Sequence, residues 1–403
     1  MNIKKYYGLL GLCGFLSIPS YATQLEATFT SNIQNGWAKV ERLASTNTNI
    51  NAEAFPSDGR GNQTGQIATF FASSQPHSKR FLLHFAPNWN ASSGKNPILL
   101  IHGANQDSDI AWANPNNAGD YGCGVSTCPN TGLMQALNST GFQVFAVTFA
   151  HKNGDSFIWS QIIHEAIERV KAVTGANKVD VISWSKGAFN ARMYVSSTTR
   201  WNAPYGNNIG QLIMLGGPNN GIDWSFRHGW NHTFAVYPGC GGVINGPTAH
   251  DNIVCYGIWW DGSDNWVYDA AYFPGAAQML KPQDDLYTLP MYEQDWYTTY
   301  YGGLGYYTYG RGIDSFMADS LVDEVRQHPT PYTVDVHNLC GDNANIALIH
   351  NEHTGPSDGV VFESSCRDNV GIGTESGSNT LSINHLQLGW HSSAINQIIN
   401  WLN

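Results

Sequence analysis

Short, mainly apolar runs recur along the middle of the chain, and each ends at glycine or polar residues. They cover residues 97–101, 143–148, 179–182 and 209–215. Such runs are typical of strands buried on both faces of a parallel sheet. Between the second and third run, residues 157–173 carry apolar side chains three or four positions apart, and Gly175 follows as a stop signal. This alternation predicts an α/β fold with a mostly parallel sheet flanked by helices and joined by right-handed crossovers.

The pattern changes towards both ends of the chain. The N-terminal part contains short alternating runs, including 66–71 and 80–85, between clusters of Gly, Asn and Ser. These runs predict β-hairpins, either at the edge of the sheet or as a small separate module. Strand-like runs return at 332–336 and 345–349, and an amphipathic helix is expected over 392–402.

Residues 222–330 show no such alternation and are rich in Trp, Tyr and Gly. We interpret this segment as a large aromatic-rich insertion that forms a cap over the substrate site. A buried aromatic core of a second subdomain is the alternative, and the two overlap because a cap needs its own core. The predicted organisation is a signal peptide at 1–22, an N-terminal β-rich edge at 23–96, a first core part at 97–221, the cap at 222–330 and a second core part at 331–403.

The first residues have the parts of a secretory signal peptide. Lys4 and Lys5 precede a short apolar core over 8–18, and a small-x-small cleavage site ends at Ala22. Cleavage there starts the mature chain at Thr23 and predicts a secreted protein, either extracellular or periplasmic. No stretch of the sequence is long and apolar enough for a transmembrane helix.

Composition and cysteine count agree with export. Charged residues make up only 13% of the chain, which is typical of a loop-rich secreted protein, and the net charge of −11 excludes the basic surface that nucleic-acid binding needs. Six cysteines remain once Cys13 leaves with the signal, and an even number in a secreted chain predicts three disulfides. Local pairing would join Cys123 to Cys128, Cys240 to Cys255 and Cys340 to Cys366. A zinc cluster is the alternative, which the absence of any CxxC pair disfavours.

The third apolar run leads into Ser183-Trp184-Ser185-Lys186-Gly187 and then into a helical stretch. Strand, sharp turn and helix around such a serine form the context of a nucleophile elbow. The residues two before and two after the serine must be small so that strand and helix can approach, and Ser183 and Gly187 meet that need, although the usual pattern has Gly first. Ser185 is therefore the candidate nucleophile. An ordinary βα turn that contains serines is the plain alternative.

A serine hydroxyl needs a base, and the base needs a carboxylate that orients it. In an elbow enzyme these follow the serine in the order acid, then histidine. Asp358 lies in a turn after strand-like sequence and is the candidate acid, with Asp342 and Asp223 as rivals. His385 lies in a loop before the C-terminal helix and is the candidate base, with His391 as the alternative.

The oxyanion of an acyl-transfer reaction needs two backbone N–H donors. The N–H of Lys186 is free at the start of the helix after the serine, and the second donor is expected from Ala104, with Asn105 as runner-up. This mechanism does not require the Lys186 side chain, which is expected to be solvated. The segment His350–His353 resembles a metal cluster at first sight, but a strand end would not bring both histidines to one face. A loop without metal is therefore expected there, and a structural metal stays the alternative.

Taken together, five motifs resemble the ordered motifs of secreted bacterial lipases and esterases of the α/β-hydrolase fold. They lie at 98–103, 183–187, 215–221, 358–361 and 385–388. The resemblance covers roughly 97–222 and 332–403. The aromatic insertion and the cysteines resemble, more loosely, lipase-like extracellular poly(3-hydroxybutyrate) depolymerases.

The sequence thus predicts a secreted serine ester hydrolase that cleaves apolar acyl esters, small or polymeric, without a cofactor. Ser185, His385 and Asp358 would form its triad. One alternative is an extracellular polyester (polyhydroxyalkanoate) depolymerase. Another is a non-catalytic protein whose exposed tryptophans bind a polysaccharide or polymer surface. A peptidase or acyltransferase is also compatible, because the triad does not choose the acyl acceptor. The oligomeric state has no signature in the sequence.

Overall fold

The computed structural model describes most of the chain outside its N-terminus and the insertion. The described residues are 23–55, 59, 61–91, 94–119, 122–201, 204–222, 258–261, 266–269, 274–279, 281, 283, 286–287, 321–346 and 355–403. Several predictions fall outside them. These are the signal peptide at 1–22, most of the insertion at 222–330, Cys240, Cys255, Asp223 and the segment His350–His353.

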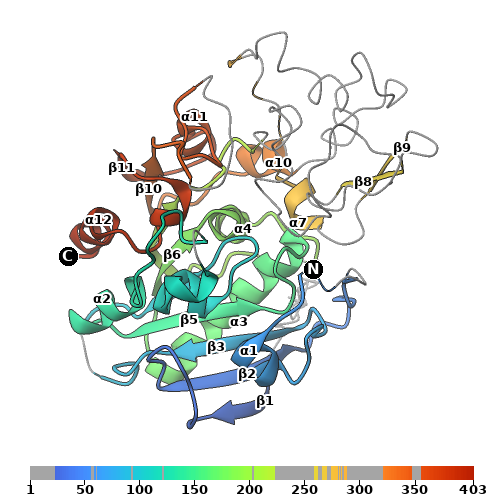
Figure 1. Ribbon diagram of the computed structural model, residues 1–403, viewed down its shortest axis with the longest axis vertical. Helices are drawn as coiled ribbons and strands as arrows, with labels where there is room; N and C mark the ends of the chain where they lie inside the picture. Colours follow the sequence, from blue (N-terminus) through green and yellow to red (C-terminus); the bar gives the residue numbers. More distant parts are fainter. Residues whose placement is uncertain are drawn as a thin grey trace, which may run out of the picture.

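Within the described residues, one nine-stranded sheet has the order β1-β2-β3-β5-β4-β6-β7-β10-β11 (Figure 1). Its strands are β1 (Thr23–Phe29), β2 (Lys39–Ser45), β3 (Arg80–Phe85), β4 (Ile98–Ile101), β5 (Val144–Phe149), β6 (Val179–Trp184), β7 (Ile209–Leu215), β10 (Asp335–Gly341) and β11 (Glu375–Leu381). Pairing is antiparallel from β1 to β5 and parallel from β5 to β11 in this order. This is the sheet of the α/β-hydrolase fold, so the predicted fold class is confirmed.

Helices cover both faces of the sheet. They are α2 (Leu133–Ser139) and α12 (Ser392–Leu402) on one face, and α3 (Ser156–Thr174) and α4 (Lys186–Val195) on the other. Strand β4 contributes to both layers because successive side chains of a strand point to opposite faces. Leu99 and Ile101 pack with α3 and α4, whereas Ile98 and Leu100 pack with α2 and α12. All four are fully buried, which explains the unbroken apolar run in the sequence.

The predicted strand at 66–71 is wrong, because these residues form helix α1 (Gly65–Phe71). The buried side chains of this helix are Ile67, Phe70 and Phe71. They lie three and four positions apart, which is helical spacing, and they pack on Val40 of β2 and Leu82 of β3. Packing on the sheet therefore outweighs the β-propensity of this short run.

The C-terminal strands also differ from prediction. Strand β10 begins at Asp335 rather than at 332, no strand occupies 342–345, and residues 347–350 lie outside the described part. The last strand is β11, whose seven residues include a single apolar one, Leu381. It lies half exposed at the edge of the sheet, so it needs no apolar side chains, and a hydrophobic pattern cannot reveal it.

Two of the three predicted disulfides are confirmed. Cys123 is bonded to Cys128, and Cys340 to Cys366. The second bridge joins the end of β10 to the short helix α11 (Glu363–Cys366). It therefore links the two ends of the segment 340–366, which contains Asp358.

Parts of the insertion dock on helices α3 and α4 (Figure 1). Its described elements are the antiparallel hairpin of β8 (Ile258–Asp261) and β9 (Trp266–Asp269), and the helices α7 (Pro274–Ala277) and α10 (Val322–Gln327). Met279 and Val322 pack against Phe189 and Met193 of α4. The backbone N–H of Ile222 donates to the carbonyl oxygen of Met279 (2.9 Å). The base of the insertion is thus attached to the helix that follows β6.

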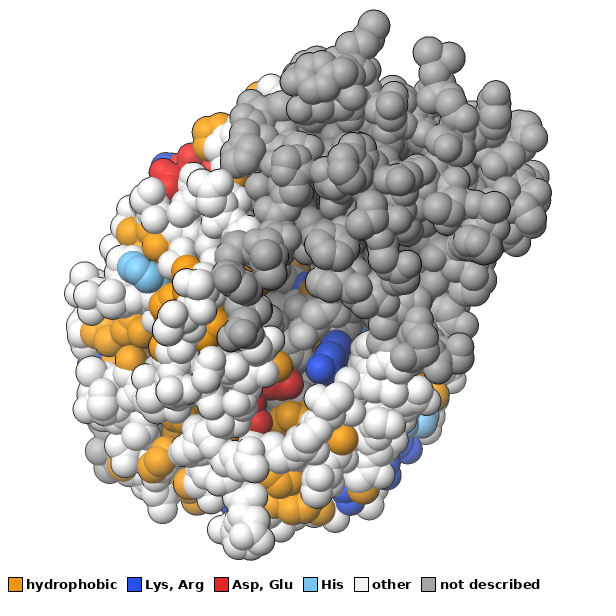
Figure 2. Space-filling view, viewed as in Figure 1, with side chains coloured by type: hydrophobic (Ala, Val, Ile, Leu, Met, Phe, Trp, Pro, Cys, Tyr) orange, Lys and Arg blue, Asp and Glu red, His pale blue; other side chains and the backbone are white. Residues whose placement is uncertain are grey.

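The described part of the surface in Figure 2 carries mostly uncharged side chains, in line with the charged fraction of 13%. Apolar side chains are spread over this face in small groups. Among the helices that the structure describes, none has the length and apolar character of a membrane span.

Candidate active site

Ser185 forms the elbow between β6 and α4. Its backbone has φ 55° and ψ −126°, a conformation that costs a non-glycine residue on the order of 1–3 kcal/mol. Hydrogen bonds hold it there. The N–H of Ser185 donates to the carbonyl oxygen of Leu215 at the end of β7 (2.8 Å), and its own carbonyl oxygen accepts from the N–H groups of Ala188 and Phe189 (2.9 and 3.2 Å). The serine therefore stands at the C-terminal end of β6, where backbone strain is typical of functional residues.

Close packing explains the small residues around the elbow. A Cβ on Gly187 would lie 2.4 Å from the carbonyl oxygen of His102 and 2.7 Å from that of Ile101, so α4 can approach β4 only with glycine here. Ser183, where the usual pattern has Gly, is fully buried, and its hydroxyl donates to the carbonyl oxygen of Ile213 (3.3 Å). The departure is tolerated because the hydroxyl is small and has a partner.

Gly187→Ala is expected to lower both stability and ester hydrolysis. The added methyl meets backbone atoms, which cannot rotate away, and overpacking of this kind costs about 1–3 kcal/mol. Helix α4 must move away from β4 and carry Ser185 with it, so kcat should fall at least about tenfold. Thermal unfolding and hydrolysis of a p-nitrophenyl ester measure the two effects.

Gly141→Ala is the matched control, because a Cβ there meets nothing within 4 Å but the residue has φ 87°. It should lose about 1–2 kcal/mol from backbone strain alone and keep its kcat. A wild-type kcat in Gly187→Ala would contradict the close-packing account.

The candidate acid and base are joined in a buried pair. Nδ1 of His385 lies 2.7 Å from Oδ2 of Asp358, and the two residues are only 4% and 1% exposed. The other oxygen, Oδ1, accepts from the N–H groups of Val360 and Val361 (3.0 and 2.7 Å). The backbone N–H of His385 also donates to the carbonyl oxygen of Asp358 (2.7 Å). Since a carboxylate only accepts, the Nδ1 of His385 carries the proton, and Nε2 is left as the basic nitrogen.

The structure brings this pair to the elbow. A Cβ on Gly216 would lie 2.9 Å from both Cε1 and Nδ1 of His385, so the imidazole lies directly against Gly216. Gly216 follows Leu215, the residue that binds the N–H of Ser185. From the other side, the indole N–H of Trp184 donates to the carbonyl oxygen of His385 (3.2 Å). Ser185 and His385 thus share the edge where β6 and β7 end.

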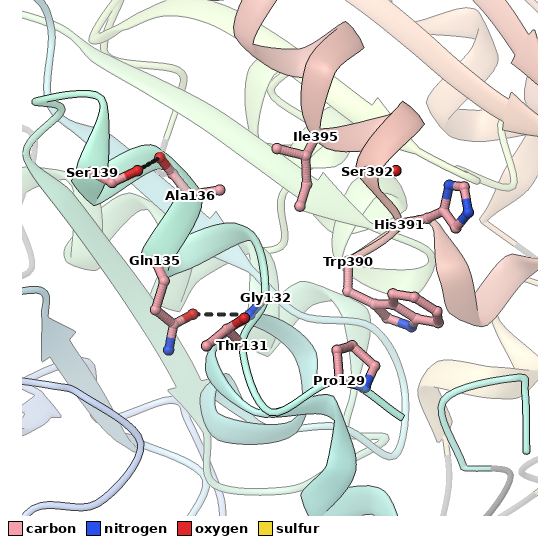
Figure 3. Close-up of a pocket in the computed structure, with 10 residues that line it drawn as sticks. All are labelled: Pro129, Thr131, Gly132, Gln135, Ala136, Ser139, Trp390, His391, Ser392 and Ile395. Carbon is pink, nitrogen blue, oxygen red and sulfur yellow. Dashed lines mark hydrogen bonds between the residues drawn. The ribbon is translucent and has the colours of Figure 1, made fainter. Parts of the chain in front are cut away.

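The rival acid and base do not take part in this arrangement. Asp342 is exposed, and Asp223 lies outside the described residues. His391 caps helix α12, where its Nδ1 accepts from the N–H of Ser393 (3.3 Å). Figure 3 shows it at a groove of about 620 Å³ between α2 and the start of α12, which Trp390 and Ile395 also line.

His391→Ala should therefore separate the two histidines. Loss of an N-cap costs about 1 kcal/mol, so the variant should unfold at a lower temperature and keep its kcat. His385→Ala should lose ester hydrolysis by a factor of about 10⁴ or more. A His391→Ala enzyme that is as inactive as His385→Ala would contradict the assignment.

The loop after β4 is held by a buried histidine. Nε2 of His102 accepts from the N–H of Phe149 (3.3 Å), so Nδ1 carries the proton and donates to the carbonyl oxygen of Gly103 (2.8 Å). Burial lowers the pKa of His102 to about 3, and the ring is therefore neutral. A Cβ on Gly103 would lie 2.9 Å from the Cβ of Ser185, so the loop passes directly beside the serine. The sequence identifies this loop as the source of an oxyanion donor, but it does not show that the His102 ring holds the loop in place.

Of the predicted oxyanion donors, Ala104 is favoured over its runner-up. The N–H of Asn105 is already bonded to the carbonyl oxygen of Lys152 (2.9 Å). The N–H groups of Ala104 and Lys186 have no hydrogen-bond partner in the part of the chain that the structure describes. Both flank Ser185, one from the loop after β4 and one from the start of α4. They are therefore free to bind an anionic oxygen between them.

The Lys186 side chain is not solvated, contrary to the prediction. It is completely buried, and its ammonium group donates to Oδ1 of Asn190 (2.9 Å) and lies 3.7 Å from the ring centre of Trp159. The sequence carried one signal for this: Asn190 is four positions further along the helix and so on the same face as Lys186. Among the described residues, no three His, Cys, Asp or Glu side chains are grouped as metal ligands would be.

One family model and several solved structures are similar to this chain. Residues 95–240 match the family model of lipases of class 2, a region that includes β4 to β7, Ser185, Ala104 and Lys186 and ends before Asp358 and His385. Among solved structures, the chain is similar to a lipase of Bacillus licheniformis in its mature form (15% identity, 77% of this chain and 94% of that chain, TM-score 0.45). It is also similar to a carboxylesterase (10% identity, 80% and 87%, TM-score 0.37) and a naproxen esterase (10%, 80% and 88%, TM-score 0.38) of Bacillus subtilis.

At these identities and TM-scores the structural likenesses carry no argument about activity. The family match is the informative finding, because it falls on the part of the chain that contains the elbow. It confirms the resemblance to α/β-hydrolase lipases and esterases drawn from the motifs, and it supports a carboxylic ester hydrolase.

Proposed function

We propose that this chain is a secreted serine ester hydrolase, a lipase or carboxylesterase, with Ser185, His385 and Asp358 as its triad. The observation that carries the proposal is the buried His385–Asp358 pair lying against Gly216, next to the residue that binds the N–H of Ser185. The class 2 lipase match around the elbow supports it independently.

In the first half of the reaction, Oγ of Ser185 attacks the ester carbonyl carbon while Nε2 of His385 takes the hydroxyl proton. Asp358 keeps the proton of Nδ1 in place and stabilises the imidazolium that forms. The N–H groups of Ala104 and Lys186 bind the negative oxygen of the tetrahedral intermediate. The carbon–oxygen bond to the alcohol then breaks, and His385 gives its proton to the departing alcohol.

In the second half, water replaces the alcohol. His385 takes a proton from the water, the hydroxide attacks the acyl carbon, and the bond to Ser185 breaks with return of the proton to Oγ. The acyl group bound in the first half leaves as the acid in the second, and water replaces the proton that Ser185 gave to the alcohol, so the cycle closes without a cofactor. The strained backbone of Ser185 supports both halves because such an elbow exposes the serine Oγ at the end of the strand.

Apolar acyl esters are the proposed substrate class, from the aromatic composition of the insertion. The disulfides Cys123–Cys128 and Cys340–Cys366 support export, since such bonds persist in oxidising compartments. An extracellular polyester depolymerase would use the same catalytic residues on a polymeric ester.

A panel of p-nitrophenyl esters of increasing chain length tests the reaction class, and release from triacylglycerol against clearing of a polyester film tests the substrate. A lipase or carboxylesterase should cleave the panel and the triacylglycerol, whereas a depolymerase should clear the film faster. A non-catalytic binding protein should cleave none of them and should not react with a fluorophosphonate probe. That last result would contradict the proposal.

A further inference from the structure

The side chain of Lys186 takes no direct part in this ester-cleavage scheme, yet it is connected to both sides of the candidate active site. Its ammonium group lies on the face of Trp159, 3.7 Å from the ring centre, and is bonded to Asn190 of its own helix. Trp159 stacks on Phe149 (3.8 Å between ring centres) and meets the ring of His102 edge-on (5.2 Å). His102 is the residue that holds the loop before Ala104. One indole ring thus supports both elements that carry the proposed oxyanion donors.

Two carboxylates face the ammonium group from other parts of the fold. Burial lowers the pKa of Lys186 to about 7, while the negative charges of Glu53 and Asp155 favour its charged form. Burial raises the pKa of Glu53, whose Oε1 accepts from the N–H of Asp155 (2.5 Å). Asp155 also pairs with Arg200 (3.5 Å), and the neutral ring of His102 is a further titratable neighbour. A buried ion with such partners, placed directly after the candidate nucleophile, is typical of a functional site.

The insertion closes over the same group. A Cβ on Gly275 would lie 2.2 Å from Cε and 2.7 Å from Nζ of Lys186, so the backbone of α7 rests directly on the ammonium end. The next residue to anchor this segment is Gln278. Its Nε2 donates to Oδ2 of Asp155 (3.0 Å), and its Oε1 accepts from the N–H of Ser156 (2.7 Å). Residues 274–279 are therefore seated on the charge cluster around Lys186.

We propose that the charged side chain of Lys186 is a positioning group for the oxyanion site, tying the first turn of α4, Trp159 and the insertion segment 274–279 into one arrangement. The proposal rests on the proposed function, because the site that it positions is the ester-cleaving one. The backbone N–H of Lys186 is the oxyanion donor, and the ammonium group fixes the turn from which that N–H points. Backbone N–H donors stabilise an oxyanion effectively only when they already point to its position before the reaction begins.

The arrangement requires the protonated form of Lys186. A neutral amine keeps its bulk but loses the attraction of the aromatic face and of the two carboxylates. Glu53 and Asp155 then repel each other without a nearby cation to offset the repulsion. Their elements, and the insertion segment that binds Asp155 through Gln278, lose a local attraction to the ammonium group, although burial makes its charged form the costlier one for the fold as a whole.

Activity and stability should therefore respond to pH in opposite directions. The folded pKa of Lys186 is about 7 and the ordinary value is 10.5, so between these values the unfolded chain binds the extra proton. The contribution of this group to stability consequently rises as the pH increases through that window. Lys186 loses its proton in the lower part of this pH window, near its folded pKa of about 7, and kcat should fall as it does. A residue that only supports the fold would change both quantities in the same direction.

The test measures kcat and KM for a soluble p-nitrophenyl ester from about pH 6 to about pH 9, on either side of the Lys186 transition. Active enzyme is counted with a fluorophosphonate probe. In the wild type, kcat should decline as the pH passes about 7. Lys186→Met keeps the length without the charge, so it should lower kcat about 10- to 100-fold below that pH, change KM little, and lose the decline. Lys186→Arg keeps a charge at every pH and should keep kcat on the alkaline side.

Glu53→Gln is the most decisive variant, because Glu53 is outside the proposed catalytic residues. Its negative charge favours the ammonium form, so its removal should move the decline in kcat to lower pH. An unmoved or raised midpoint overturns the proposal, as does a wild-type kcat in Lys186→Met. If the Lys186 variants do not fold, the wild-type profile and Glu53→Gln still decide. Failure of the proposed function looks different: the wild type then cleaves no ester and binds no probe, and this proposal falls with it.

Discussion

Ser185→Ala should lose ester hydrolysis by a factor of at least about 10⁴ in kcat while the protein stays folded. The substitution removes a single heavy atom, Oγ of Ser185, which is the atom that would bond to the acyl group. Alanine keeps the backbone contacts of the elbow, including the bond from the N–H at position 185 to Leu215. Hydrolysis of a p-nitrophenyl ester and thermal unfolding, measured on the same preparation, check both parts.

Ser183→Ala is the matched control for this variant. It removes a serine hydroxyl two residues earlier in the same elbow, where the group donates to Ile213 in the interior. We expect a modest loss of stability of about 1 kcal/mol and a kcat within a few fold of wild type. If Ser185→Ala kept its activity, or if both variants lost it equally, Ser185 would not be the nucleophile.

Asp358→Asn should lower kcat by about 10⁴-fold with little effect on folding. The amide oxygen can keep the bonds from the N–H groups of Val360 and Val361, so the amide NH₂ must face Nδ1 of His385. An NH₂ group only donates, which forces Nδ1 to accept and places the ring proton on Nε2. His385 then has no lone pair on the nitrogen that should take the proton from Ser185. Steady-state kinetics, with circular dichroism to verify folding, measure the effect.

Asp342→Asn provides the comparison, because Asp342 is the rival acid from the same part of the sequence and is exposed. It should leave kcat unchanged. An Asp342→Asn enzyme that loses activity while Asp358→Asn keeps it would reverse the assignment of the acid.

Chain order made the pairing of Asp358 with His385 predictable from the sequence. An elbow serine requires an acid and then a histidine after later strands, and sequence context favours Asp358 over two rival acids and His385 over His391. The structure joins Asp358 to His385 by a bond of 2.7 Å and places His391 at a helix cap instead. The sequence could not show the second reason for this choice, which is the packing of the His385 ring on Gly216.

The fold was predictable where an unbroken apolar run or a regular amphipathic spacing marks an element, as in β4 and α12. Strand β4 has four buried apolar residues in a row, and its position was found from that pattern alone. Strand β11 lies at the sheet edge with polar residues, and the alternating pattern of 66–71 predicts a strand because only packing on Val40 and Leu82 selects helix α1. Local patterns report burial and its period, so they miss a polar edge strand and a short helix whose packing partners lie elsewhere in the chain.

Among the site residues, Lys186 differs most from the sequence prediction, because it is buried rather than solvated. A lysine in a sequence is assigned to solvent by default, since burying its charge without partners is costly. Its partners come from far along the chain: Glu53 from the N-terminal part, Trp159 from α3 and Gly275 from the insertion. No spacing rule connects these positions, so only the folded structure could show that they meet.

The identity of the nucleophile is tested most directly by mass spectrometry of the fluorophosphonate-labelled protein. The probe reacts with a serine only when a neighbouring base has activated it. The account predicts one adduct, on Ser185, which is lost in Ser185→Ala and greatly slowed in His385→Ala. An adduct on another residue, or full ester hydrolysis by a protein that carries no adduct after exposure to the probe, would contradict it.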